Sequence, residues 1–207
     1  MLLVGTYLSP FARRVAAALL SRGIQFEHDD LNGYADPVRA RTLNPVGKVP
    51  VLRLDDGESL IDSAAILDHI NESLPPSLAL LPQAGAERRE VLRLAAIATT
   101  IYERSTACYF ERQRAPEGQR REVIDAQRPA IIGGLEALDA ASASGGPIGR
   151  RPLDAATISA VVAREYVGIT MPDIPIALVA PALTAVSAEL FNEDAFAKTR
   201  PVPTGAA

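Results

Sequence analysis

Short apolar runs alternate with segments of helical periodicity over the first 75 residues. Residues 2–7 form an apolar run that predicts a strand, and the apolar spacing after Pro10 predicts a helix that ends at Gly23. Residues 24–28 alternate like a second strand. The apolar positions that define the first helix are Phe11, Val15, Ala18 and Leu19.

The second half of this segment adds a helix, two strands and another helix, separated by turn signals. We expect a helix from Asp36-Pro37 to near Asn44, strands over residues 51–54 and 59–61 around the turn Asp55-Asp56-Gly57, and a helix over residues 63–74. The resulting order, β-α-β-α-β-β-α, predicts an open α/β domain over residues 1–75.

The pattern becomes purely helical after a proline-rich linker at residues 76–85. Residues 86–207 are therefore expected to form an all-α helical bundle. We expect a helix over residues 119–141, whose continuity Pro129 and Gly133-Gly134 leave open, a helix capped by Asp154, and another over residues 181–190. The first and longest helix has one apolar stripe, which comprises Val91, Ala95, Ala98, Ile101, Tyr102, Ser105 and Cys108.

Composition narrows the classes of function. The chain has 207 residues, 48% of them hydrophobic and 22% charged, which is typical of a globular protein. A net charge of −4 without a dense Lys/Arg stripe argues against nucleic acid, and no apolar run is long enough to span a membrane. The N-terminus lacks the basic segment of a secretory signal. We therefore expect a cytoplasmic protein.

The cysteine and lysine content adds two smaller inferences. Cys108 is the only cysteine, which excludes an intrachain disulfide and a cysteine-based metal cluster, so no metal is expected. Basic residues are mostly arginine, with lysine only at positions 48 and 198, which is typical of GC-rich bacterial codon usage.

Three short polar clusters stand where a strand is followed by a helix or a loop. They are Ser9-Pro10-Phe11, Lys48-Val49-Pro50 and Asp62-Ser63. A helix beginning at Ser63 offers unpaired N–H groups, a hydroxyl cap and the positive end of its dipole, which suit a carboxylate. Asp62 beside it suits an ammonium group, so the pair could hold the head of an α-amino acid.

Each cluster also has a purely structural interpretation. Ser9 is either a donor that stabilises a bound thiolate or simply the N-cap of its helix. Pro50 is either an ordinary proline at the start of a strand or part of a cis turn that directs the backbone of Val49 toward a ligand. Lys48 either neutralises a carboxylate or is merely solvated. Neither His28 nor His69 has the sequence context of a Ser-His-Asp hydrolase.

Together these clusters resemble the cytosolic glutathione transferase family, across nearly the whole chain. The resemblance is carried by Ser-Pro-Phe-Ala-Arg-Arg-Val at 9–15, Asn-Pro-Val-Gly-Lys-Val-Pro-Val-Leu at 44–52, Leu-Ile-Asp-Ser-Ala-Ala-Ile at 60–66, and Leu-Leu-Pro at 80–82 as the interdomain linker. It implies a thioredoxin-like N-terminal domain with a glutathione site. Asp62 and Ser63 would then hold the γ-glutamyl head, Val49 before cis-Pro50 would pair with the cysteinyl backbone, and Lys48 would lie near the glycyl carboxylate.

The resemblance also implies an activity and an assembly. Glutathione would be the co-substrate, and Ser9 would activate its thiol for attack on a small electrophile, with Tyr7 as the rival activator. Plausible walls for that electrophile are Leu8, Tyr102, Thr106 and Tyr109, which core packing explains equally well. A homodimer is expected to form through the helix over residues 86–112 and the edge of the α/β domain.

The C-terminal half departs from the family pattern at a helix cap. A buried helix there usually opens Ser/Thr-x-x-Asp, whereas this chain has Asp154 and Thr157 at those positions. Aspartate can accept from the N3 amide and threonine can reach back, so we expect the cap to survive.

Two other functions remain open. One is a non-catalytic glutathione-binding or regulatory protein on the same scaffold, since a fold does not guarantee its reaction. The other is a glutathione-dependent isomerase or reductase. The isomerases' usual Ser-Ser-Cys stretch is absent from residues 7–10, and a serine at position 9 leaves no thiol there for disulfide chemistry.

Overall fold

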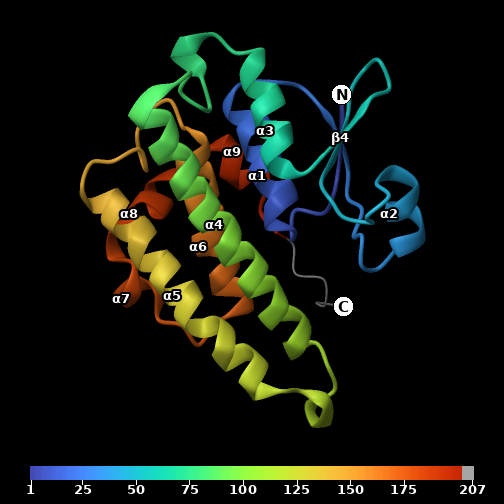
Figure 1. The fold of residues 1–207 in the computed structure, drawn as a ribbon, viewed down its shortest axis with the longest axis vertical. Helices are drawn as coiled ribbons and strands as arrows, with labels where there is room; N and C mark the ends of the chain where they lie inside the picture. The colour runs from blue at the N-terminus through green and yellow to red at the C-terminus, as the bar shows by residue number, and fades with distance from the viewer. Residues whose placement is uncertain (202–207) are drawn as a thin grey trace. The chain divides into compact units, whose positions relative to one another are not determined.

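A computed structural model describes residues 1–201 of the chain (Figure 1). Its contacts divide the chain into two compact units. The first contains Met1–Leu81 together with the residues that follow Leu190, and the second contains Pro82–Leu190. Within the described part of the chain, no helix is long and apolar enough to cross a membrane.

The first unit is built on a four-stranded sheet in the order β2-β1-β3-β4. Strand β1 pairs with β2 in parallel and with β3 antiparallel, and β3 pairs antiparallel with β4. The predicted β-α-β-α-β-β-α order is confirmed. The first three strands are shorter than predicted: β1 is Leu2–Val4, β2 is Glu27–Asp29 and β3 is Val51–Arg53. The fourth, β4, is Ser59–Ile61, as predicted.

The helices of this unit begin where the capping residues predicted. They are α1 (Pro10–Ser21), α2 (Pro37–Leu43) and α3 (Ser63–Glu72), followed by the 3₁₀ turn η1 (Pro76–Leu78). Ser9 and Asp36 are the N-caps of α1 and α2, each with a proline in the first turn. Gly23, with a φ of 66°, follows the C-cap of α1 as expected. Most of α1 is buried, so this helix forms the centre of the unit.

The last described residues belong to this first unit, although the helical domain was expected to extend to residue 207. Helix α9 (Asp194–Ala197) packs on α1, and Phe196 is fully buried there. Arg13 Nε donates a hydrogen bond of 3.4 Å to Thr199 Oγ1. Burial of Phe196 therefore draws the end of the chain back to the α/β unit. Residues 202–207 of the expected domain lie outside the described residues.

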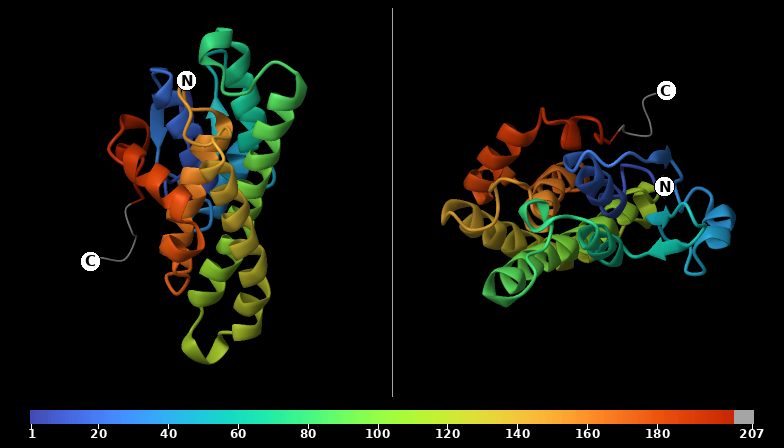
Figure 2. Two further views of the ribbon diagram at one scale, coloured as in Figure 1. Left: turned by 90° about the vertical axis from the view of Figure 1, so that its left-hand side faces the viewer. Right: turned by 90° about the horizontal axis from the view of Figure 1, so that it is seen from above.

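The second unit is helical, as predicted. It contains α4 (Gly85–Arg112), the 3₁₀ turn η2 (Pro116–Gly118), α5 (Arg121–Ala143), α6 (Ala155–Thr170), α7 (Ile176–Val179) and α8 (Pro181–Leu190). Helices α4 (green) and α5 (yellow) run side by side (Figures 1 and 2). The apolar stripe predicted on α4 is buried in full.

Helix α5 runs unbroken through Pro129, which settles the continuity that the sequence left open. Gly134 follows one turn later and lies against α4. A Cβ added at Gly134 would stand 2.7 Å from Ile101 Cγ1, which is closer than side chains approach in folded proteins. The glycine that weakens the helical pattern in the sequence therefore allows the two long helices to pack closely.

The predicted cap of α6 is present, with one addition. Asp154 Oδ1 accepts a hydrogen bond of 2.7 Å from the Thr157 backbone N–H. The Thr157 hydroxyl was expected to reach back to the start of the helix. It also donates to Pro147 O and accepts from Gly149 N–H, each at 3.1 Å. The threonine therefore holds the preceding loop in addition to its contact with Asp154.

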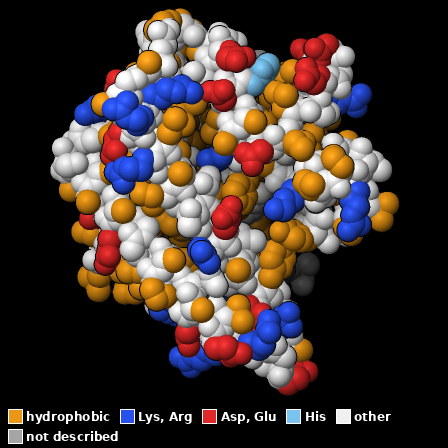
Figure 3. Space-filling view, viewed as in Figure 1, with side chains coloured by type: hydrophobic (Ala, Val, Ile, Leu, Met, Phe, Trp, Pro, Cys, Tyr) orange, Lys and Arg blue, Asp and Glu red, His pale blue; other side chains and the backbone are white. Residues whose placement is uncertain are grey.

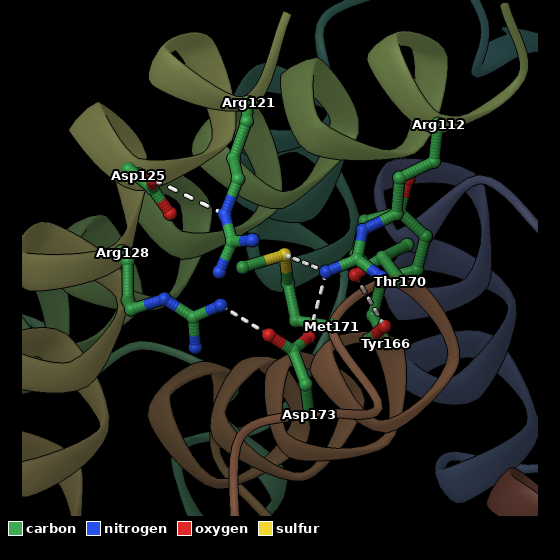
Figure 4. A network of polar contacts seen from close by, with 8 residues as sticks. All are labelled: Arg112, Arg121, Asp125, Arg128, Tyr166, Thr170, Met171 and Asp173. Carbon is green, nitrogen blue, oxygen red and sulfur yellow. Dashed lines mark hydrogen bonds and ion pairs between the residues drawn. The ribbon is translucent and has the colours of Figure 1, made fainter. Parts of the chain in front are cut away.

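An ion-pair network ties three parts of the helical unit together (Figure 4). Asp173, which follows α6, accepts from Arg112 of α4 at 2.6 Å and from Arg128 of α5. Burial raises the pKa of Asp173, but hydrogen bonds from the two arginines outweigh it and lower the pKa overall. The carboxylate therefore stays ionised at neutral pH. This network connects secondary-structure elements, and its residues were not singled out in the sequence.

Cys108 lies close to this network and is fully buried. Burial raises the pKa of its thiol, although the charges of Arg112 and Arg128 act in the opposite direction. A buried, protonated thiol behaves as a small apolar side chain, as the sequence suggested.

Candidate functional site

The three polar clusters meet around the N-terminal half of α1. A Cβ built on Gly5 would lie 2.9 Å from the Cβ of Ala12 and 3.0 Å from that of Val49, so the end of β1, the start of α1 and the turn before β3 touch. Arg14, two residues after Ala12, contacts Ser63 at the start of α3. Residues distant in the sequence thus form one site inside the first unit.

Ser9 caps α1 and is only half-buried. Its Oγ accepts a hydrogen bond of 3.4 Å from the Ala12 backbone N–H. The structural interpretation of Ser9 is therefore correct, and it does not exclude the functional one. A hydroxyl has two lone pairs and one hydrogen, and the cap uses only a lone pair. The hydrogen can still be donated to an anion at the positive end of the α1 dipole.

Tyr7, the rival activator, is held in a ring stack. Its ring lies parallel to that of His28, with centroids 4.0 Å apart. The imidazole Nε2 is 2.9 Å from Gly5 O, so this nitrogen carries a hydrogen. Burial and the charge of Asp30 raise the pKa of Tyr7. The side chain is therefore a neutral phenol at neutral pH, which can donate a hydrogen bond but cannot act as a base toward a thiol.

The Val49–Pro50 peptide bond is cis, so Pro50 belongs to a cis turn rather than to an ordinary strand start. The backbone N–H and C=O of Val49 have no hydrogen-bond partner within residues 1–201. They are therefore available to an extended ligand, which can pair with them as a strand pairs with a sheet edge. Lys48 is exposed beside them.

Asn44 fixes the loop that carries Lys48 and Val49. It is 2% exposed. Its Nδ2 donates to Lys48 O at 2.9 Å, and its Oδ1 accepts from the Val46 N–H at 3.1 Å. In the sequence this residue was noted as the end of a helix and as the first residue of the stretch 44–52 that carries the family resemblance. Its position directly before Pro45 was consistent with a turn residue, but no sequence pattern showed that its amide would hold both sides of the loop.

The start of α3 differs from the prediction in one respect. Asp62, not Ser63, is the N-cap: its Oδ1 accepts a 2.7 Å hydrogen bond from the Ala64 N–H. Asp62 is exposed and has a φ of 69°, the one positive φ outside glycine in the described part of the chain. Such a conformation costs about 1–3 kcal/mol and is concentrated at functional sites.

Ser63 is the first residue of α3, and its hydroxyl faces α1 rather than a free amide. The residue is 2% exposed. Its Oγ accepts two hydrogen bonds from Arg14, one from Nε at 3.0 Å and one from Nη2 at 2.7 Å. Arg14 lies in the stretch 9–15 that carries the family resemblance, but its contact with Ser63 was not predicted. Asp62 and Ser63 are thus neighbours with separate roles, one capping the helix and one held by a buried guanidinium.

The residues proposed as walls for a second substrate have different environments. Leu8 is half-buried in the first unit, where its N–H donates to Thr6 Oγ1 at 3.3 Å. Tyr102 is fully buried in the second, and its hydroxyl donates to Ser159 O at 2.7 Å. Core packing therefore accounts for Tyr102, and it cannot line an open site.

The other two wall candidates lie on the same helix and are half-buried. Thr106 exchanges a hydrogen bond of 2.9 Å with the Tyr166 hydroxyl, and Tyr109 packs edge-on against Phe110. Both keep some exposed surface, so they remain candidates.

Comparison with known proteins indicates the same family as the sequence motifs and the geometry of the site. Residues 3–77 match the model of the glutathione S-transferase N-terminal domain. The uncharacterized GST-like protein YibF of Escherichia coli K12 is 30% identical over 201 residues, which cover 97% of this chain and 98% of that protein. The chain belongs to the glutathione transferase family.

Solved structures support the same family assignment. A family member from Pseudomonas fluorescens Pf-5 with bound glutathione is 31% identical, covers 97% of this chain and 98% of its own, and superposes with a TM-score of 0.85. A glutathione S-transferase from Methylobacterium radiotolerans in complex with glutathione sulfonate reaches a TM-score of 0.89 at 25% identity, over 100% of this chain and 97% of its own. The resemblance stated from the sequence is confirmed, as is its fold.

Proposed function

We propose that this glutathione transferase activates the thiol of glutathione for attack on a small electrophile. The observation that carries the proposal is the position of the Ser9 hydroxyl at the N-terminus of α1. Its oxygen caps the helix by accepting from the Ala12 N–H, and its hydrogen can be donated to the thiolate of glutathione. Two of the structural relatives are described with glutathione or a glutathione derivative bound.

The energy required is within the reach of this arrangement. A free thiol has a pKa near ~8.5, so it is mostly protonated at neutral pH. Lowering that pKa by ~2 units takes roughly 2.7 kcal/mol of preference for the thiolate. A charge-assisted hydrogen bond contributes about 1.5–3 kcal/mol and a helix N-terminus about 0.3–1 kcal/mol. The Ser9 hydroxyl and the α1 dipole together can therefore supply the required preference for the thiolate.

The remaining polar groups match the rest of the tripeptide. Asp62 would pair with the γ-glutamyl ammonium group, and Ser63 with the N-terminus of α3 would hold the neighbouring carboxylate. The unpaired backbone of Val49 would bond the cysteinyl residue, and Lys48 would lie near the glycyl carboxylate. The charges in the site are therefore complementary to those of glutathione along its length.

Affinity for glutathione should depend on Asp62 and Ser63 more than on any other pair. Asp62→Asn should weaken binding while keeping the helix cap, because asparagine caps as well as aspartate does. Ser63→Ala should cost about 1–2 kcal/mol of binding free energy, because it removes a hydroxyl contact. Titration calorimetry with glutathione measures both. Undiminished affinity in the two variants would show that the site lies elsewhere.

The function itself is tested by assaying a panel of electrophiles with glutathione, together with the ultraviolet absorbance of the bound thiolate. Retention on a glutathione column without a thiolate band or turnover would favour the regulatory alternative. Conversion of a cis double bond with glutathione present would favour the isomerase. A maleylacetoacetate isomerase of Pseudomonas aeruginosa is 36% identical over 74 residues, but this match covers only 33% of the chain and 35% of that protein.

A homodimer is the proposed assembly. Hydrophobic side chains reach the surface over α2 (Figure 3), where Tyr34, Val38 and Val46 are 68%, 72% and 67% exposed. Leu92 on α4 is 43% exposed. These side chains favour burial against a partner. Sedimentation at micromolar concentration should give a dimer, and a 22.0 kDa monomer alone would contradict the proposed homodimer.

We also place the protein in the cytoplasm, where thiols such as that of glutathione are kept reduced.

A further inference from the structure

A single tight turn connects β1 to α1 and ends at Ser9. The Ser9 backbone N–H donates to Thr6 O at 2.9 Å, which makes residues 6–9 a β-turn with Tyr7 and Leu8 at its two central positions. The Leu8 N–H also donates to Thr6 Oγ1 at 3.3 Å. The direction of the Ser9 hydroxyl at the start of α1 therefore depends on how the centre of this turn is held.

His28 of strand β2 holds this turn from the side through two contacts. Its Nε2 donates to Gly5 O at 2.9 Å, because a carbonyl oxygen can only accept. Its ring lies flat on that of Tyr7, with centroids 4.0 Å apart and an angle of 1° between the planes. His28 is exposed, so it does not serve to fill the core of the unit. Its imidazole instead restrains the residue before the turn and the first central residue of the turn.

We propose that His28 is a positioning residue for the Ser9 hydroxyl. By fixing Gly5 O and the Tyr7 ring, it keeps residues 6–9 in the conformation in which the Ser9 hydrogen is directed at the thiol of bound glutathione. The inference rests on the proposed function, in which Ser9 stabilises the thiolate. Hydrogen bonds weaken with misalignment, and a small displacement of a catalytic group is costly. A looser turn should therefore stabilise the thiolate less and leave recognition of the rest of the tripeptide unchanged.

The stack gives Tyr7 a role that differs from that of a rival activator. His28 contacts the face of the Tyr7 ring, and an aromatic ring offers that face with or without its hydroxyl. The support for Ser9 should therefore survive in Tyr7→Phe, which keeps the ring, and be lost in Tyr7→Leu, which does not.

Separate substitutions at position 28 remove each contact. His28→Gln keeps a donor that can reach Gly5 O but has no ring, His28→Phe keeps the ring but has no donor, and His28→Ala has neither. The Gly5 N–H donates to Asp29 O at 2.9 Å through the backbone, so the loop stays attached to β2 in all three variants. Arg39→Met is the control, because it removes the ion pair with Asp29 that holds the same strand from α2.

Two measurements on the full chain separate activation of the thiol from binding of the tripeptide. The ultraviolet thiolate band of bound glutathione, followed against pH, gives the pKa of its thiol and needs no electrophile. Titration calorimetry with S-methylglutathione, whose sulfur has no proton to lose, gives the affinity for the tripeptide alone.

His28→Ala should raise the pKa of the bound thiol by about 0.5–1 unit, a loss of roughly three- to tenfold in preference for the thiolate. His28→Gln and His28→Phe should each show a smaller rise. Affinity for S-methylglutathione should stay unchanged in all three variants, and Arg39→Met should leave the thiol pKa where it is. In a Tyr7→Leu background, His28→Gln should cause little further rise, because the stack is already lost.

An unchanged thiol pKa in His28→Ala would overturn the inference. An equal rise in Arg39→Met, or an equal weakening of S-methylglutathione binding, would also overturn it, because a merely structural histidine would have these effects. An equal rise in Tyr7→Phe and Tyr7→Leu would assign the effect to the phenol hydroxyl and reject the stack.

If His28→Ala fails to fold, as circular dichroism would show, the thiol pKa in His28→Gln and Tyr7→Leu decides. A wild-type protein that binds glutathione without a thiolate band is a separate outcome. It would reject the proposed function, and this inference with it.

Discussion

Replacing Ser9 with alanine is expected to lower turnover about 100-fold, the change that corresponds to ~2.7 kcal/mol lost from the transition state. Affinity for glutathione should remain nearly intact, because Asp62, Ser63 and Val49 would still hold the tripeptide. The bound thiol would have a higher pKa, so the ultraviolet thiolate band at neutral pH would fade. Steady-state kinetics and a spectroscopic pH titration of the complex measure the two effects.

Ser9 is also a helix cap, so loss of stability has to be separated from loss of chemistry. Removing a cap typically costs about 0.5–2 kcal/mol of folding free energy. Asp36→Ala is the matched control, because Asp36 Oδ1 caps α2 through a 3.0 Å bond from the Arg39 N–H. That variant should lose comparable stability and keep its turnover. Ser9→Thr, which retains both hydroxyl and cap, should keep most of the activity.

Tyr7→Phe distinguishes the rival activator within the same assay. The ring is stacked on His28, and Ser9 rather than Tyr7 stands at the N-terminus of α1, so removal of the Tyr7 hydroxyl should change turnover little. If Tyr7→Phe abolished the thiolate band and Ser9→Ala did not, the activating role would pass to Tyr7 and the transferase assignment would stand. If wild-type protein bound glutathione without a thiolate band, the site would recognise the tripeptide without activating it, and the regulatory alternative would be preferred.

Local signals made much of the fold predictable from the sequence. Serine or aspartate followed by proline indicated where α1 and α2 begin, and the turn Asp55-Asp56-Gly57 correctly separated β3 from β4. The buried stripe of α4 followed from helical periodicity alone. Each of these features depends on residues within a few positions of one another, which is the range that a sequence pattern reports.

The features that sequence reasoning missed depend on distant residues. Arg14 and Ser63 are 49 positions apart, and nothing local shows which of two adjacent arginines will meet the serine. Residue 199 joins the first unit through Arg13, 186 positions away. Ser63 was expected to cap α3 because serine is a good cap, but Asp62 one residue earlier takes that place. Tertiary packing decided each case.

Gly5 is a further residue that the sequence did not single out, and Gly5→Ala is expected to be the most disruptive single substitution in the first unit. Its φ is 143°, a conformation that residues with a Cβ rarely adopt. The added Cβ would also stand 2.9 Å from Ala12 Cβ and 3.0 Å from Val49 Cβ. Backbone strain of about 1–3 kcal/mol and overpacking of about 1–3 kcal/mol should together reduce the free energy of unfolding, which chemical denaturation measures.

Gly57→Ala is the matched control, because Gly57 also has a positive φ, 93°, but a Cβ there would meet no atom within 4 Å. It should show the backbone strain alone and retain affinity for glutathione. Gly5→Ala should lose affinity in addition, because neither Ala12 nor Val49 can yield without moving α1 or the backbone proposed to pair with the cysteinyl residue. Titration calorimetry on the folded fraction of each variant separates the loss of affinity for glutathione from the loss of folding stability. If Gly5→Ala bound glutathione as tightly as Gly57→Ala does, the backbone of Val49 would not be part of the site, and only the ends of the tripeptide would be recognised.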